Sequence, residues 1–209
     1  MTKRMLKERK SEHYYLRAKR EGYRSRSAYK LLHISERFNL MREGEVVVDL
    51  GCAPGGWMQV SRQLVGDHGY VLGVDKRPIE KIGESNTGFI IADVTDPKTV
   101  DLVIEALPRK ADVLLSDLAP NVSGIWQVDH LRQMDLARAA LSMARRVLRL
   151  NGKFMTKTFQ GESLDQFVEE LKDQFSSVRI VRPPATRKRS AEVYLLATGF
   201  LEGEPEKCL

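Results

Sequence analysis

The sequence predicts an α/β fold: one seven-stranded, mostly parallel sheet that ends in an antiparallel hairpin, with helices on both faces. Two observations lead to this prediction. After residue 40, short apolar β-branched runs alternate with longer helical patterns, which is typical of β-α units around a parallel sheet. A glycine-rich turn at residues 51–56 follows the first run, where such folds commonly build a nucleotide pocket.

The elements follow in order along the chain. Residues 1–40 are predicted to be helical and basic, with one apolar side that docks on the sheet: Leu31, Leu32, Ile34, Phe38 and Leu40. Strands are expected near residues 45–50, 70–74, 88–92, 111–116, 152–159, 177–181 and 191–198. Helices are expected near residues 56–65, 97–107, 129–149 and 163–175.

Two local signals refine this plan. Gly152, after a basic turn, is a good helix-stop signal for the third of these helices. The Pro183-Pro184 loop leaves no room for a helix between the last two strands, so they should form the antiparallel hairpin. We expect a single domain over residues 1–209, with the α/β core at 41–200 and a tail at 201–209.

Composition excludes several classes of protein. No apolar run approaches the roughly 20 residues that span a bilayer, and the N-terminus has no apolar stretch of the signal-peptide kind. The only two cysteines, Cys52 and Cys208, suggest neither a disulfide framework nor a metal cluster. We therefore expect a cytoplasmic protein with no membrane contact and no metal.

Positive charge is concentrated in two segments. Residues 1–30 hold eleven Lys or Arg against three Glu, a net of +8, whereas the whole chain carries +6. A second cluster at 179–189 comprises Arg179, Arg182, Arg187, Lys188 and Arg189. Tyr14, Tyr15, Tyr23 and Tyr29 are interleaved with the first cluster. Cations for phosphates and aromatic faces for bases favour RNA as a partner, although a solvated basic helix would look similar.

The glycine turn favours a nucleoside ligand without phosphates. Gly51, Gly55 and Gly56 let the backbone turn sharply. Ala53 stands where a pyrophosphate-binding turn needs glycine, and Asp49 at the strand end would repel a phosphate. S-adenosylmethionine is the obvious candidate ligand.

Three acids follow successive strand runs at the edge where ligands bind in such sheets. Asp49 ends the first strand, Asp75 is placed to accept bonds from ribose hydroxyls, and Asp93 is placed to reach the adenine amine. Each alone could be a helix cap or turn residue, and Asp75 could equally bind the ribose of NAD. Trp57 either walls the pocket or packs in the core.

Four further residues stand out by position. Lys30 lies in the basic segment, Asp117 ends a strand, and Lys157 and Glu192 are flanked by strand residues. A strand lysine is unusual, because lysine is almost never buried without a partner. The plain alternatives are an edge-strand cation for Lys157, a turn residue for Asp117 and a surface acid for Glu192.

At these residues the sequence resembles the FtsJ/RrmJ family of 2′-O-ribose RNA methyltransferases, in its large-subunit rRNA branch. Five ordered blocks carry the resemblance: residues 22–26, 49–57, 116–121, 157–161 and 192–194. It implies a Rossmann-like methyltransferase fold, S-adenosylmethionine as cofactor and a catalytic tetrad of Lys30, Asp117, Lys157 and Glu192. It also implies cofactor contacts at Gly55, Trp57, Asp75, Asp93 and Asp117.

The resemblance further implies a uridine of 23S rRNA in the large ribosomal subunit as target, reached through the N-terminal and 179–189 basic surfaces. We expect a monomer. Lys157 would either take the proton of the ribose hydroxyl or, with Lys30, orient the hydroxyl and stabilise the developing oxyanion. Methylation of a tRNA anticodon loop or an mRNA cap, a non-catalytic RNA-binding assembly factor and an NAD-dependent oxidoreductase are the competing readings.

Overall fold

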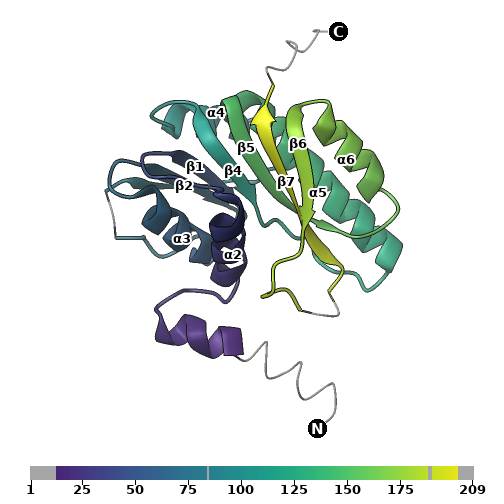
Figure 1. Cartoon of the computed structure of the whole chain (residues 1–209), viewed down its shortest axis with the longest axis horizontal. Helices are drawn as coiled ribbons and strands as arrows, with labels where there is room; N and C mark the ends of the chain where they lie inside the picture. The colour runs from purple at the N-terminus through teal and green to yellow at the C-terminus, as the bar shows by residue number, and fades with distance from the viewer. Residues whose placement is uncertain (1–12, 84, 188–189, 202–209) are drawn as a thin grey trace.

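The computed structural model describes residues 13–83, 85–187 and 190–201 (Figure 1). Its seven strands form one sheet in the order β3-β2-β1-β4-β5-β7-β6. The strands are β1 (Val46–Leu50), β2 (Tyr70–Asp75), β3 (Thr87–Ile91), β4 (Ala111–Ser116), β5 (Leu148–Phe159), β6 (Phe175–Val181) and β7 (Glu192–Phe200). The first five strands pair in parallel, and β7 lies antiparallel between β5 and β6. The predicted mostly parallel sheet with an antiparallel terminal hairpin is confirmed.

Helices cover both faces, also as predicted. The helices are α2 (Ala28–Phe38), α3 (Gly56–Val65), α4 (Thr99–Ala106), α5 (Trp126–Val147) and α6 (Leu164–Lys172), and residues 13–20 are helical as well. Side chains of α2 and α3 share one buried apolar cluster with one face of the sheet, whereas α4, α5 and α6 contribute to the cluster on the other face. None of the helices in the described part of the chain is long and apolar enough to cross a membrane.

The central strand β1 shows why the sheet needs both helical layers. All five of its residues are buried. Val46 and Val48 pack in the cluster on the α5 side, whereas Val47 packs in the cluster on the α2 side. Because successive side chains of a strand point to opposite faces, an unbroken apolar run fits only a strand that is covered twice.

The junction between α5 and β5 corrects one expectation. The helix ends at Val147, five residues before Gly152, and β5 begins at once with Leu148. Asn151 has φ 59°, and the register against β4 shifts between Ala111 and Val113. The chain therefore makes its irregular turn inside the strand, so Gly152 marks a bulge and not the end of a helix.

The N-terminal segment docks on the body as predicted. Leu31, Ile34 and Leu40 are buried, and Leu32 and Phe38 pack partly buried against the same cluster. Residues 21–27 interrupt the helical segment between residues 13–20 and α2. Ala18 and Tyr29 pack with Ala185, which comes from the loop between β6 and β7. The two basic segments are thereby joined in space.

Candidate active site

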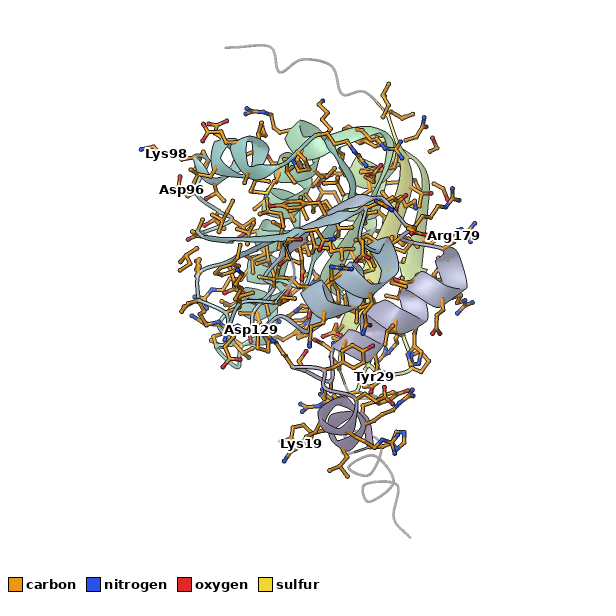
Figure 2. The ribbon with its side chains drawn as sticks, turned by 90° about the vertical axis from the view of Figure 1, so that its left-hand side faces the viewer. Lys19, Tyr29, Asp96, Lys98, Asp129 and Arg179 are labelled. Carbon is orange, nitrogen blue, oxygen red and sulfur yellow. The ribbon has the colours of Figure 1, made fainter. Side chains whose placement is uncertain are left out.

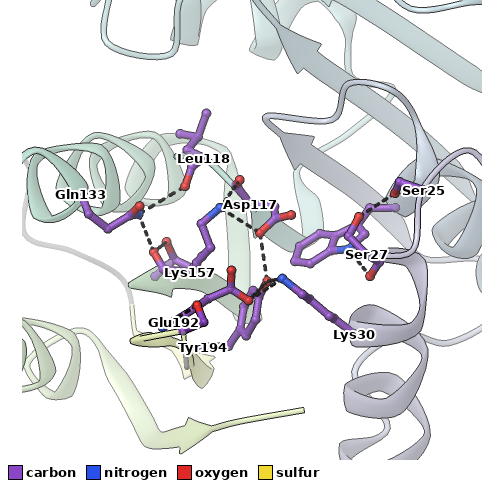
Figure 3. A network of polar contacts seen from close by, with 12 residues as sticks. Ser25, Ser27, Lys30, Asp117, Leu118, Gln133, Lys157, Glu192 and Tyr194 are labelled. Atoms are coloured by element: carbon purple, nitrogen blue, oxygen red, sulfur yellow. Dashed lines mark hydrogen bonds and ion pairs between the residues drawn. The ribbon is translucent and has the colours of Figure 1, made fainter. Parts of the chain in front are cut away.

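The predicted catalytic residues meet at the C-terminal edge of the parallel strands (Figure 3). Asp117 directly follows β4, Lys157 lies near the end of β5, and Glu192 begins β7. Lys30 reaches this edge from α2. Parallel strands carry their carboxyl ends to one edge, so residues 40 and 162 positions apart in the sequence become neighbours.

Charged groups of the tetrad are joined in one network. The Lys157 ammonium donates to the Asp117 carbonyl oxygen at 2.8 Å and lies 3.2 Å from Oδ1 of the Asp117 side chain. The Lys30 ammonium forms an ion pair with the Glu192 carboxylate. Side chains of Lys30 and Glu192 are only 10% and 14% exposed, so this pair is largely withdrawn from water. Two cations and two anions thus balance one another in a mostly buried site.

Tyr194 links the two ion pairs and was not among the predicted site residues. Its hydroxyl donates to Asp117 Oδ1 at 2.9 Å and accepts a hydrogen bond from Lys30 Nζ at 3.2 Å. Burial raises the pKa of Tyr194 well above its usual value, and the charges of Asp117 and Glu192 raise it further. The hydroxyl therefore stays protonated. Its position two residues after Glu192 on the same strand was the signal that could have identified it.

Trp57 holds α2 against the glycine turn. Its indole Nε1 donates to the Ser27 carbonyl at 2.9 Å, and its ring lies 5.8 Å from that of Tyr194. Only 2% of Trp57 is exposed. Of the two interpretations of Trp57, the geometry favours core packing, with the added effect of fixing the helix that carries Lys30.

Gln133 of α5 fixes the other side of the network. Its amide nitrogen donates to the backbone oxygens of Leu118, at 3.2 Å, and Lys157, at 2.9 Å (Figure 3). It thereby ties the end of β5 to the loop after β4. Sequence reasoning missed this residue, because a glutamine inside a helical pattern gives no functional signal.

Asp49 differs from every acid of the tetrad. It is completely buried, and neither carboxylate oxygen has a hydrogen-bond partner among the described residues. Burial raises its pKa well above the usual value, and the neighbouring Asp117 and Asp75 add to the effect. A buried acid without partners is costly, so this position suits a cationic or hydrogen-donating ligand.

The other two predicted cofactor acids hold the surrounding loops. Asp75 is 8% exposed and accepts from the backbone N–H groups of Ala53, at 3.0 Å, and Arg77, at 2.9 Å. Asp93 forms an ion pair with Lys76 at 2.7 Å and accepts from Thr95, and these contacts lower its pKa. Asp93 is therefore at least a turn residue, and its contact with a cofactor stays a prediction.

The glycine turn is shaped by neighbours in the chain itself. Gly51 has φ 76°, and a Cβ there would lie 3.1 Å from the Leu118 nitrogen. A Cβ on Gly55 would meet the Arg24 guanidinium, and one on Gly56 would meet the Ser25 hydroxyl. The close approach that these last two glycines allow is thus to the N-terminal segment.

Arg24 is half-buried and forms hydrogen bonds to two neighbouring loops. Its guanidinium donates to the carbonyl oxygens of Pro54, Glu80 and Lys81, at 3.3, 2.6 and 3.1 Å. It joins the cofactor turn to the loop after β2. The block at residues 22–26 therefore holds the glycine turn in place, and the Arg24 guanidinium is engaged within the protein.

The basic surfaces are narrower than their composition suggests. Arg17 pairs with Glu21 at 2.8 Å, and Arg20 lies 3.6 Å from the same carboxylate with 77% of its side chain exposed. Lys19 is exposed on the outlying helical segment (Figure 2). Burial lowers the pKa of Arg26, and the nearby charge of Arg187 lowers it further. The two clusters therefore converge close to Glu192, which acts on Arg26 in the opposite direction. Residues 1–12, Lys188 and Arg189 lie outside the described residues.

Three of the four interleaved tyrosines are not free to stack on bases. Tyr29 is buried, donates to Glu21 at 2.8 Å and contacts the rings of Tyr14 and Tyr23. Tyr15 is 59% exposed. The expectation of aromatic faces on this surface is therefore wrong for Tyr29, because its ring is needed to dock the segment.

Within the residues described, no three His, Cys, Asp or Glu gather as a metal site would require.

Comparison with known proteins identifies the family to which the chain belongs. Residues 23–200 match the model of the FtsJ-like methyltransferase family. The ribosomal RNA large subunit methyltransferase E of Methanothrix thermoacetophila is 51% identical over 91% of this chain and 73% of its own length. Its counterpart from Methanococcus aeolicus is 46% identical over 95% of this chain and 74% of its own length.

A solved structure gives the same result for the fold. A Plasmodium falciparum protein described as a ribosomal RNA methyltransferase superposes with a TM-score of 0.77 at 26% identity. The match covers 86% of this chain and 99% of that one. The resemblance drawn from the five motif blocks and the predicted Rossmann-like methyltransferase fold are both confirmed.

Proposed function

The chain belongs to the FtsJ-like methyltransferase family, and we propose that it transfers a methyl group from S-adenosylmethionine to a ribose 2′-hydroxyl of large-subunit ribosomal RNA, at a uridine. One observation carries the proposal. Lys30, Asp117, Lys157 and Glu192 come from four distant segments and form one buried polar network at the ligand-binding edge of the sheet. The names of its relatives support rRNA as the substrate class, and we expect the protein in the cytoplasm.

The residues beside the tetrad fit S-adenosylmethionine. Asp49 offers an unpartnered buried carboxylate, and Asp75 lies at the end of the neighbouring strand with its oxygens at the glycine turn. We assign Asp75 to the ribose hydroxyls, Asp93 to the adenine amine, and Asp49 and Asp117 to the positively charged methionine end. Gly51, Gly55, Gly56 and Trp57 shape the turn around them. The cofactor, when bound, supplies an electrophilic methyl group on a sulfonium.

Lys157 is the residue that acts on the ribose hydroxyl. Asp117 holds its ammonium with a carbonyl oxygen and a carboxylate oxygen, which fixes the direction of the side chain. An uncharged Lys157 would accept the hydroxyl proton, and a charged one would orient the hydroxyl and stabilise its developing negative charge. Lys30, held by Glu192 and Tyr194, adds a second cation to the same network.

RNA would approach over the joined basic surface. Arg26 and Arg187 lie near Glu192, and Lys19 and Arg20 extend the positive surface outward. Cations in this arrangement can bind phosphates on the strand whose ribose enters the site. Arg17 and Arg24 contribute structure here, since their guanidinium groups are engaged within the protein.

The test is methyl transfer from labelled S-adenosylmethionine to large ribosomal subunits, free rRNA and tRNA, with nucleoside analysis of the product. We expect 2′-O-methyluridine in the subunits, and loss of about 10²–10⁴-fold in rate for Lys157→Ala with cofactor binding retained. Lys172→Ala, which removes an exposed lysine from the last turn of α6, is the matched control and should leave the rate unchanged.

Other outcomes would change the assignment. Label in tRNA alone would keep the chemistry and replace the substrate. Cofactor binding without label in any RNA would favour a non-catalytic RNA-binding factor. Lys157→Arg separates the two roles of the lysine, because arginine stays charged and cannot accept the proton. Partial activity in that variant would favour the orienting role.

A further inference from the structure

An exposed apolar patch borders the site, and the proposed chemistry does not use it. It lies on the loop after Asp117 and at the first residue of α5, where Val122, Ile125 and Trp126 are 74%, 59% and 46% exposed. Apolar side chains gathered on a surface next to a site commonly mark an interaction surface. The Arg132 side chain borders the same loop, donating to the Asn121 carbonyl at 3.4 Å.

The Trp126 ring is fixed close to the reacting lysine. It stacks on Phe159 with a centroid distance of 6.0 Å and an interplanar angle of 27°. Phe159 ends β5 two residues beyond Lys157, a backbone step of about 7 Å at the usual strand rise. His130 of the next helical turn also stacks on Trp126, with centroids 5.9 Å apart. With these two rings holding it, the indole still keeps 46% of its surface exposed beside the strand that carries Lys157.

Polar contacts hold the patch in place. Asp129, labelled in Figure 2, accepts hydrogen bonds from the Ser123 backbone N–H at 2.7 Å, the Ser123 hydroxyl at 2.8 Å and the Gly124 N–H at 3.1 Å. His130 Nε2 accepts from the Ser163 backbone N–H at 3.2 Å. These bonds anchor the loops that follow β4 and β5 to one helix, so the platform is formed before a ligand arrives.

We propose that Trp126 is a stacking platform for an unstacked base of the RNA substrate, at or next to the nucleotide whose ribose enters the site. The inference rests on the proposed function for its substrate class. A ribose can reach Lys157 only if its nucleotide leaves the regular stack, and a displaced base regains stacking on an aromatic side chain. The neighbouring Arg132 supplies a cation for the phosphate of the same strand.

Binding of short RNA tests the platform without requiring catalysis. The probes are a short single-stranded oligouridylate and an abasic strand with the same ribose–phosphate backbone. We expect Trp126→Ala to weaken binding of the oligouridylate about tenfold and to leave the abasic strand unaffected, because stacking of one base is lost. Trp126→Phe keeps an aromatic face and should retain most of the affinity. Leu102→Ala, which removes a side chain of equal 46% exposure on α4, should change neither probe.

Fluorescence adds a direct readout. The chain has two tryptophans, and Trp57 is buried, so quenching of the emission by oligouridylate reports on Trp126 and should disappear in Trp126→Phe. Equal loss of both strands, or no loss of either, overturns the proposal, as does a wild-type protein that does not bind the oligouridylate. If Trp126→Ala weakens binding of neither strand, the patch would instead fit a ribosomal protein or a second copy of the chain. Failure of methyl transfer with base-dependent binding intact would refute the proposed reaction alone.

Discussion

Two polar clusters lie side by side at the same edge of the sheet, and they differ in how their charges are satisfied. In the tetrad, every charged side chain has an oppositely charged partner, and Tyr194 bridges the two ion pairs. One strand away, Asp49 is completely buried and has no partner for either oxygen among the described residues. The tetrad is complete before any ligand binds, whereas the Asp49 side is not.

The difference follows from what each cluster has to do. A group that moves a proton or holds a hydroxyl must be oriented in advance, and fixed partners provide that orientation. A cofactor pocket must release its product after each reaction, so its binding groups cannot be saturated by the protein. We therefore expect a cationic ligand to offset the cost of burying Asp49 without partners.

Breaking the satisfied cluster should have the largest effect on stability. Lys30→Met leaves the Glu192 carboxylate largely buried and unpaired, and we expect it to lower the free energy of unfolding by about 3 kcal/mol in urea denaturation. Combining it with Glu192→Met should recover at least half of that loss, because two apolar side chains leave no unpaired charge.

A surface pair provides the matched control for this experiment. Lys172 and Glu169 lie 2.8 Å apart with 54% and 69% of their side chains exposed. Lys172→Met should therefore change the free energy of unfolding by less than about 0.5 kcal/mol. Additive losses for the Lys30 and Glu192 substitutions would contradict the view that the two charges stabilise each other.

Much of this arrangement could be predicted from the sequence. The order of strands along the chain and the edge where they end follow from local patterns, since apolar runs and the polar residues after them are visible in one dimension, whereas the tetrad was assigned through the family resemblance. Tyr194 and Gln133 were missed because a buried tyrosine and a helical glutamine look like ordinary core and surface residues. Their roles depend on contacts 77 and 24 positions away.

The N-terminal segment shows the opposite error. Its cations and tyrosines predicted an RNA surface, yet Arg17, Arg24 and Tyr29 are engaged in internal contacts. Composition counts charges and rings but does not reveal which of them a segment needs to dock on the body. The same limit applies to Gly55 and Gly56, whose missing side chains make room for that segment.

Removing the unpartnered charge of Asp49 should have a smaller effect, and it should raise the free energy of unfolding. Asp49→Asn replaces an acid whose pKa burial has raised, so it should stabilise the ligand-free protein by about 1–2 kcal/mol at pH 8. The pKa of Asp49 is raised in the folded protein. Such a carboxyl group favours folding at pH values below its pKa in the unfolded chain, and this contribution is lost as the pH rises toward its pKa in the folded protein. The advantage of the variant should therefore grow from about pH 4 upward.

Cofactor and a second acid sharpen the Asp49 test. S-adenosylmethionine should raise the melting temperature of the wild type more than that of Asp49→Asn, because only the wild type has a buried carboxyl group without partners that the ligand could stabilise. Asp112 is the control: burial alone would raise its pKa, but Val46 N–H, Arg149 and Arg109 lower it. Asp112→Asn should lower the free energy of unfolding, and most strongly above pH 4. If the Asp49 and Asp112 variants changed the free energy of unfolding in the same direction, the proposed difference between the two acids would be refuted.

The smallest effect should come from the residue that joins the satisfied pairs. Tyr194→Phe keeps the ring that packs against Trp57 and removes only the hydroxyl that Asp117 and Lys30 share. Lys157 still holds Asp117, and Glu192 still holds Lys30. We therefore expect a loss of only about 1 kcal/mol in the free energy of unfolding, because both partners of the lost hydroxyl keep another hydrogen-bonded partner. The rate of methyl transfer should fall while the affinity for cofactor is unchanged, because the hydroxyl positions the two ion pairs relative to each other. An unchanged rate would mean that the two ion pairs hold their geometry independently, and that the satisfied cluster is two units instead of one.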